Sequence, residues 1–119
     1  MKPESYLTDY GKRIFNTIAS YLEKKGLDQD VTSLELSMLA NSFDLYYQAA
    51  EDIKQNGWQQ HNERSGAMVV TPAYMIMKTE FTNIKNHAPK FGLNPVDVQK
   101  LKGEDKKEES PLANLRKTG

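Results

Sequence analysis

Cysteine is absent from the 119-residue sequence, which excludes disulfide bonds, thiolate metal sites and thiol chemistry. Histidine is scarce, since His61 and His87 are the only two. Neither has a carboxylate at metal-ligand spacing, and a zinc site needs three or four ligands. No apolar run reaches the roughly 18 residues that span a membrane, and no signal-peptide segment is recognisable. We therefore expect a soluble cytosolic domain that holds no metal.

Motifs for catalysis are also missing. The sequence has no P-loop or other glycine-rich phosphate cradle. No serine or threonine stands in a recognisable nucleophile context. The carboxylates of Glu51 and Asp52 are adjacent in a helical segment, so they face different directions. We expect a protein that is not an enzyme and that needs no cofactor.

Charge is balanced overall, with 16 basic and 16 acidic side chains, so the net charge favours no partner. Its distribution is uneven. Residues 28–53 contain six acidic and no basic side chains, whereas residues 1–27 contain five basic and three acidic ones, and residues 54–102 contain seven basic and three acidic ones. Such blocks allow chain segments, or neighbouring subunits, to pair by charge, although solvated helix faces produce the same pattern.

The first helix is predicted at about residues 8–25, after a frayed lead-in at residues 1–6. Thr8 can cap it, and Lys24 and Lys25 suit its last turn because cations complement the helix dipole. Gly26 ends it in a Schellman turn that Leu27 can complete. The buried side is predicted to contain Leu7, Ile14, Ile18, Tyr21 and Leu22, with Phe15 on the flank.

The second helix is predicted at about residues 33–55, before Asn56 and Gly57. Thr32 and Glu35 have the spacing of a capping box. Its apolar residues form one stripe of Leu36, Leu39, Phe43, Tyr46, Ala50 and Ile53, and a second set of Leu34, Met38, Leu45 and Ala49. Because an apolar surface wider than one stripe is usually covered on more than one side, we expect another subunit to supply the second cover.

A β-hairpin or extended loop is predicted at about residues 58–70, where a polar, turn-rich centre separates two short segments. Thr71 and Pro72 then open a third helix at about residues 72–91, antiparallel to the second. Its stripe repeats every three or four residues and contains Tyr74, Met77, Phe81, Ile84, Ala88 and Phe91. Pro89 should either bend this helix or separate its last residues into another turn.

A short fourth helix is predicted at about residues 95–101. Gly92 suits a left-handed C′ position, Asn94 can cap the next helix, and Pro95 suits its first turn. We therefore predict a mainly α bundle that forms one domain at residues 1–102, with an N-terminal helix at 8–27 and an oligomerisation hairpin at 32–91. Residues 103–119 are charged and read as a disordered tail, with a short docking segment at 110–115 as the alternative.

The segment Phe91-Gly92-Leu93-Asn94-Pro95, followed by Leu101, resembles the C-terminal box of one large family of phage terminase small subunits, which typically reads F-G-L-T-P. The order of helices and loop is also similar over residues 7–102. Asn94 stands where threonine is usual, which preserves capping. Residues 96–98 lack the basic residue often seen before the final leucine, so we do not place DNA contacts there.

This resemblance implies a non-enzymatic adaptor that binds double-stranded phage DNA in the cytoplasm of the bacterial host. It also implies that the adaptor forms a ring-shaped homo-oligomer and presents the DNA to a large subunit with ATPase and nuclease activities. Because these small subunits commonly bind DNA through an N-terminal helical region, the candidates are Lys12, Arg13, Lys24 and Lys25, which also suit plain solubility. The candidate oligomerisation residues are Leu36, Leu39, Phe43, Tyr46, Ile53, Tyr74, Met77, Phe81 and Ile84.

Two other function classes remain open. A small helix-turn-helix regulator would have a turn of three or four residues between two DNA-facing helices, whereas the first linker here, at residues 26–31, is longer. A helical interaction module without a DNA role would suit the zero net charge. An electrophoretic shift with phage DNA would separate that module from a packaging protein.

Overall fold

A computed structural model describes residues 1–93 of the chain. It confirms a mainly α fold with a small antiparallel hairpin between the second and third helices. The elements are α1 (Asp9–Lys24), α2 (Ser33–Asn56), β1 (Gln59–His61), β2 (Met68–Val70), α3 (Pro72–His87) and the 3-10 turn η1 (Ala88–Phe91). The predicted helix at 95–101 and tail at 103–119 lie outside the described residues. No helix among the described residues is long and apolar enough to cross a membrane.

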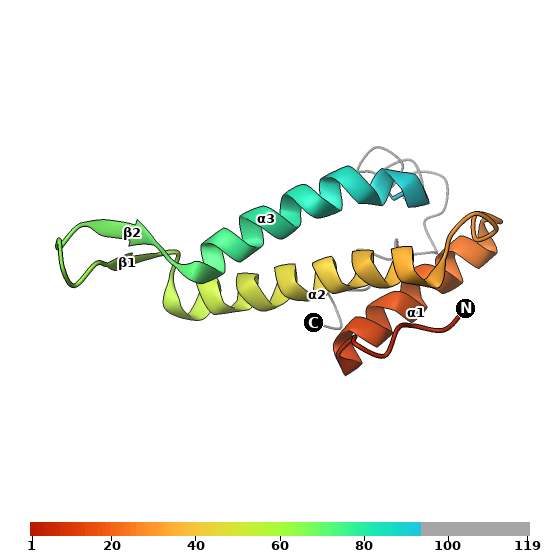
Figure 1. Ribbon diagram of the computed structural model, residues 1–119, viewed down its shortest axis with the longest axis horizontal. Helices are drawn as coiled ribbons and strands as arrows, with labels where there is room; N and C mark the ends of the chain where they lie inside the picture. The colour runs from red at the N-terminus through yellow and green to blue at the C-terminus, as the bar shows by residue number, and fades with distance from the viewer. Residues whose placement is uncertain (94–119) are drawn as a thin grey trace.

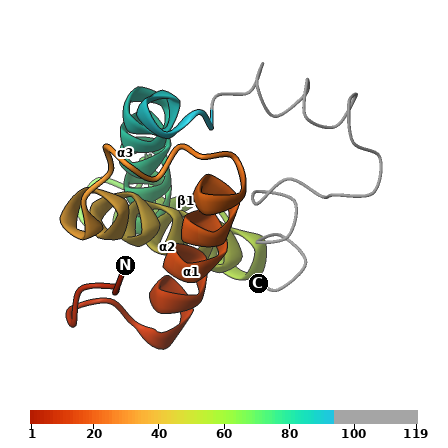
Figure 2. The same ribbon diagram turned by 90° about the vertical axis from the view of Figure 1, so that its right-hand side faces the viewer.

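Helix α2 is the central element of the fold (Figure 1). Helix α1 packs against its N-terminal half, and α3 runs back along it in the antiparallel direction. The β1–β2 hairpin projects beyond the far end of the α2–α3 pair. The molecule therefore has a three-helix end, seen face-on in Figure 2, and a two-helix arm that ends in the hairpin.

Each α-helix begins at a threonine whose hydroxyl accepts a hydrogen bond from a backbone N–H three residues later. The three caps are Thr8 to Gly11 at 2.9 Å, Thr32 to Glu35 at 3.1 Å and Thr71 to Tyr74 at 3.3 Å. The predicted capping box is only half formed. The Glu35 carboxylate accepts a hydrogen bond from the Thr32 hydroxyl at 2.9 Å. In a complete capping box it would accept one from the Thr32 backbone N–H instead.

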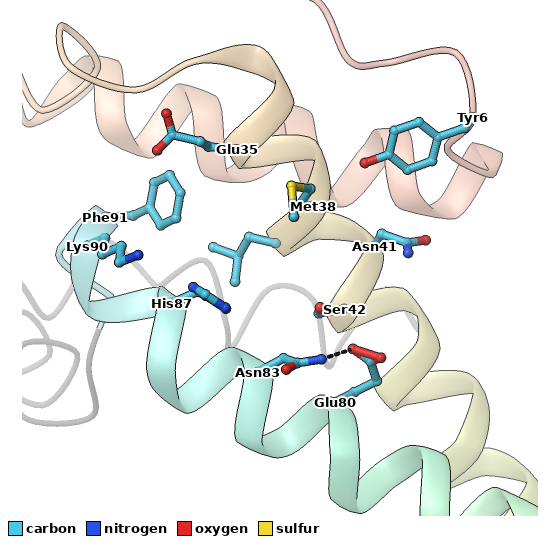
Figure 3. A pocket seen from close by; sticks show the side chains of 11 residues that line it. Tyr6, Glu35, Met38, Asn41, Ser42, Glu80, Asn83, His87, Lys90 and Phe91 are labelled. Atoms are coloured by element: carbon cyan, nitrogen blue, oxygen red, sulfur yellow. Dashed lines mark hydrogen bonds between the residues drawn. The ribbon is translucent and has the colours of Figure 1, made fainter.

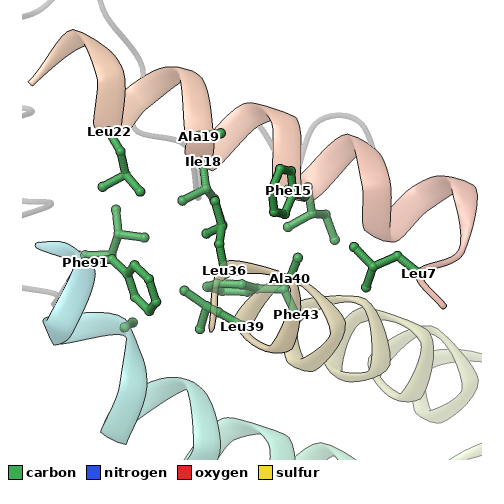
Figure 4. Packing of buried hydrophobic residues seen from close by; sticks show 13 residues of the cluster. Leu7, Phe15, Ile18, Ala19, Leu22, Leu36, Leu39, Ala40, Phe43 and Phe91 are labelled. Atoms are coloured by element: carbon green, nitrogen blue, oxygen red, sulfur yellow. The ribbon is translucent and has the colours of Figure 1, made fainter. Parts of the chain in front are cut away.

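The hydrophobic core lies at the three-helix end, where α1, the first half of α2 and the residues after α3 meet (Figure 4). Phe15, predicted on the flank of the first helix, is fully buried, because α2 covers a wider face of α1 than one stripe. The core residues are Leu7, Ile14, Phe15, Ile18, Ala19, Leu22, Leu36, Leu39, Ala40, Phe43, Ala88, Phe91 and Leu93.

Near Pro89, the α-helix α3 gives way to a short 3-10 turn. The predicted helix at 72–91 stops as an α-helix at His87, and Ala88–Phe91 forms a 3-10 turn, as expected where proline cannot donate a backbone bond. Gly92 then adopts the left-handed conformation with φ of 71°. Leu93 N–H donates to Ala88 C=O at 3.1 Å, which is the long bond of a Schellman ending.

The lead-in before α1 is packed, contrary to the frayed start predicted from sequence. The Glu4 backbone N–H donates to the hydroxyl of Ser37 at 3.0 Å, and the Glu4 carboxylate accepts from Ser33 at 3.1 Å. Both serines belong to the first turns of α2, and Ser37 is fully buried. Leu7 follows in the core. Hydrogen bonds to serines, which no apolar periodicity reveals, therefore hold this segment against α2.

Candidate functional surfaces

The four cationic candidates all lie on α1 or at its end, but they do not share one face. Arg13 and Lys24 are eleven residues apart, which places them within about 20° of each other around the helix and about 16 Å apart along it. Both are exposed. Lys12 and Lys25 lie on other sides of the helix, and Lys12 is half-buried. The structure therefore places Arg13 and Lys24 on the same exposed side of α1, and we call these two residues the basic strip.

Arg13 is held in place by an aromatic neighbour. Its guanidinium carbon lies 5.1 Å from the centre of the Tyr10 ring, a distance at which the ring face attracts a cation. Burial raises the pKa of the Tyr10 hydroxyl, the charge of Arg13 partly opposes that rise, and the Asp44 carboxylate adds to it. The N-terminal turn of α1 is thus electrostatically linked to α2, where Asp44 lies.

The nine candidate oligomerisation residues divide by burial into three groups. Leu36, Leu39 and Phe43 lie in the core of the chain itself and are at most 4% exposed. Phe81 is 56% exposed. The other five are half-buried between α2 and α3, and they are Tyr46, Ile53, Tyr74, Met77 and Ile84. Within the arm, the small residues Ala49 and Ala73 are the buried ones.

Further apolar side chains are exposed on α3, before Phe81, and on α2. Met75 and Ile76 of α3 are 52% and 44% exposed, and they were not among the predicted candidates because they fall off the stripe. The uninterrupted apolar run from Tyr74 to Met77 is the sequence feature from which they could be recognised. On α2, Leu34 and Met38 from the predicted second set are also exposed. At about 100° per residue, Met75, Ile76 and Phe81 point to different sides of α3, so they are separate exposed apolar side chains and not one continuous patch.

A groove of about 480 Å³ lies between the first half of α2 and the last turns of α3 (Figure 3). Its wall combines apolar side chains with scattered polar ones, and the Asn83 amide donates to the Glu80 carboxylate at its rim at 3.0 Å. The lining residues are Tyr6, Glu35, Met38, Leu39, Asn41, Ser42, Glu80, Asn83, His87, Lys90 and Phe91.

The two histidines lie in separate parts of the fold. His61 is in β1, where Nδ1 lies 3.3 Å from Gly66 C=O, and His87 ends α3 beside the groove. Within residues 1–93, no three histidine, cysteine, aspartate or glutamate side chains gather as metal ligands would.

Comparison with protein families gives one match. A family model described as "Phage terminase, small subunit" covers residues 11–108. This span runs from the first turns of α1 through the core, the arm and the hairpin. No curated protein and no solved structure gives a significant match to the chain.

Proposed function

Because the chain belongs to the family of phage terminase small subunits and so has a role in phage packaging, we propose that it is a DNA-recognition adaptor that acts as a ring. In this proposal several copies assemble, bind double-stranded viral DNA in the bacterial host cytoplasm, and present it to the large subunit. The ATPase and nuclease activities belong to that large subunit. The family match carries the proposal, and two surfaces of the fold support it.

The first support is the basic strip of α1. Arg13 and Lys24 face outward on the same side of a helix whose other side is buried in the core, so their positions are fixed by packing. Two cations per subunit make a weak contact with phosphate. A ring repeats that contact, and the effective concentration of the linked sites turns weak contacts into firm binding.

The second support is a set of apolar side chains that α2 and α3 leave exposed. Met75, Ile76 and Phe81 are exposed on α3, and Met38 is 58% exposed on α2. A single chain leaves these side chains in water at a cost of roughly 25 cal/mol for each Å² of apolar surface. In a ring each copy has two neighbours, and head-to-tail contacts with both would cover more than one side of the α2–α3 pair; such contacts close when their rotation permits.

The DNA role is tested by the salt dependence of binding. Log affinity should fall linearly against log salt with a slope of about −0.9 per phosphate neutralised. We expect the double variant Arg13→Glu, Lys24→Glu, which reverses both charges of the basic strip, to flatten this slope while the particle mass is kept. The matched control is Lys54→Glu with Arg64→Glu, which makes the same charge change on exposed residues far from α1. Equal slopes in wild type and the α1 variant would remove α1 from the DNA surface.

Two other functions predict different structures or binding results. A helix-turn-helix regulator needs a tight turn between its DNA-facing helices, but α1 ends at Lys24 and α2 begins only at Ser33. A helical interaction module without a DNA role would give no electrophoretic shift with phage DNA at low salt. A shift that the α1 variant weakens would support the packaging adaptor over both.

A further inference from the structure

The β1–β2 hairpin is an ordered structure that the core does not cover. All six strand residues are exposed, and the hairpin projects away from the helices (Figure 1). An isolated two-stranded hairpin is marginally stable in water. This hairpin is nevertheless fixed at both ends, which indicates that its shape serves a contact outside the chain.

The tip and the base of the hairpin are both held by specific contacts. At the tip, the Asn62 side-chain oxygen accepts from the backbone N–H of Arg64 at 2.9 Å, and Gly66 N–H donates to Asn62 C=O at 2.7 Å. At the base, the Trp58 and Tyr74 rings pack with centroids 5.5 Å apart. The strands between these points are therefore presented in one geometry.

The register shows which backbone groups point outward. Asn62 N–H donates to Ala67 C=O at 2.8 Å, and Thr71 N–H donates to Trp58 C=O at 2.9 Å. Because antiparallel pairs alternate between bonded and non-bonded types, the Gln59–Val70 and His61–Met68 pairs are non-bonded. The N–H and C=O groups of Gln59 and His61 therefore face away on one edge. Those of Met68 and Val70 do so on the other, and within residues 1–93 no third strand meets either edge.

Apart from their short length of three residues each, the two edge strands lack the devices that normally limit strand pairing. Proteins protect open edges with charged side chains, proline or bulges. The strands here contain Gln59, Gln60, His61, Met68, Val69 and Val70, with no lysine, carboxylate or proline. The edges are therefore open to another strand.

We propose that the β2 edge of one copy pairs with the β1 edge of the next copy, so that hairpins link neighbouring subunits in the assembly. This inference rests on the ring in the proposed function. A second copy fits better than DNA, because the hairpin has one acidic and one basic side chain, Glu63 and Arg64, and no cation on its strands. Pairing β1 with β1 would close a dimer and leave both β2 edges open. Pairing β2 with β1 uses both edges of every copy and repeats by rotation.

Two proline variants test this pairing. Gln59→Pro removes an outward N–H on β1, and Val70→Pro removes one on β2. Neither touches a bond inside the hairpin, because both residues belong to the non-bonded pair. The matched controls are Gln59→Ala and Val70→Ala, which change the same side chains but keep the N–H. Fluorescence of Trp58, the only tryptophan, and helical circular dichroism verify that each variant is folded.

Light scattering at micromolar concentration gives the decisive result. We expect wild type and both alanine variants at several times the 13.6 kDa chain mass, and each proline variant alone as a monomer. An equimolar mixture of the two proline variants should give a two-chain species, since one intact β1 edge meets one intact β2 edge.

Other outcomes overturn the pairing in different ways. Proline variants that assemble like wild type would overturn it while leaving the ring and the DNA role intact. If Gln59→Pro abolished assembly and Val70→Pro did not, the result would indicate pairing of β1 with β1 instead. A monomeric wild type would overturn both this inference and the ring in the proposed function.

Discussion

The hydroxyl of Thr8 joins the start of α1 to the middle of α2. It accepts a hydrogen bond from Gly11 N–H at 2.9 Å and donates one to the Asp44 carboxylate at 2.7 Å. Asp44 is only 2% exposed, and its other oxygen accepts from the Gln48 amide at 2.8 Å. One side chain thus caps a helix and satisfies a buried carboxylate of its neighbour.

Thr8→Val should therefore destabilise the chain by about 2 kcal/mol or more. Loss of an N-cap costs about 1 kcal/mol, and a buried acceptor without its donor costs about 1–3 kcal/mol. Thr8→Ser keeps the hydroxyl and should cost less than about 1 kcal/mol, the worth of one methyl group. Urea unfolding of the three proteins checks the ranking. Equal losses in Thr8→Val and Thr8→Ser would mean that the hydroxyl does not stabilise the fold.

The turns that end α1 and η1 meet each other. Gly26 and Gly92 both have positive φ, at 68° and 71°. A Cβ on Gly92 would stand 3.2 Å from Leu27 Cδ1, whereas one on Gly26 would have nothing within 4 Å. The two glycines therefore share a conformational requirement, but only Gly92 adds a steric one.

Gly92→Ala should destabilise the chain more than Gly26→Ala does. Both substitutions force an L-residue into a left-handed conformation, at about 1–2 kcal/mol each, and Gly92→Ala also crowds Leu27. The excess should fall when Leu27→Ala is combined with Gly92→Ala, which a double-mutant cycle of thermal unfolding measures. An additive cycle would show that the contact with Leu27 is not the source of the excess.

Phe81 and Phe91, ten residues apart, should respond differently to the same substitution. Phe91 is 4% exposed in the core and Phe81 is 56% exposed on the arm. Phe91→Ala should cost about 3–5 kcal/mol of folding stability. Phe81→Ala should change the stability of the single chain by about 0.5 kcal/mol at most and should lower the mass of the assembly. Light scattering and unfolding of both variants separate the roles, and a Phe81→Ala protein with unchanged mass would exclude Phe81 from the subunit contact.

The sequence predicts the helices of this fold well because their boundaries depend on local chemistry. Thr8, Thr32 and Thr71 cap as expected, and the glycine endings at Gly26 and Gly92 are in place. The sequence predicts the burial of Leu7 but not the packing of residues 1–6, since that packing depends on Ser33 and Ser37 of another element. The sequence also does not show whether Pro89 bends or ends the helix, because that outcome depends on whether Phe91 reaches the core.

The candidate surfaces are less readable from sequence, because a helical stripe does not reveal which neighbour covers it. Leu36, Leu39 and Phe43 form a stripe that suits a subunit contact, but α1 covers them within the same chain. The stripe of α3 is only half covered, which leaves Phe81 exposed. The resemblance to terminase small subunits names four cations in the N-terminal region as DNA candidates, whereas the helix geometry places only Arg13 and Lys24 on one side of α1.

The link between Tyr10, Arg13 and Asp44 predicts a pH effect on stability. Burial raises the pKa of Tyr10 above its usual value of 10.0, so the folded chain holds that proton more tightly than the unfolded chain does. The resulting stability is fully present below pH 10 and is lost as the pH rises through the higher pKa of the folded state. The Tyr10→Phe variant has no proton to lose at this position, so its unfolding free energy should decline less than that of wild type between pH 9 and about pH 12.

Urea unfolding across this pH range measures the difference. The matched control is Tyr6→Phe, because Tyr6 is an exposed tyrosine. Parallel declines in wild type and Tyr10→Phe would show that the Tyr10 proton is held no more tightly in the folded chain. A decline flattened only by Tyr10→Phe would confirm that burial raises the pKa of Tyr10.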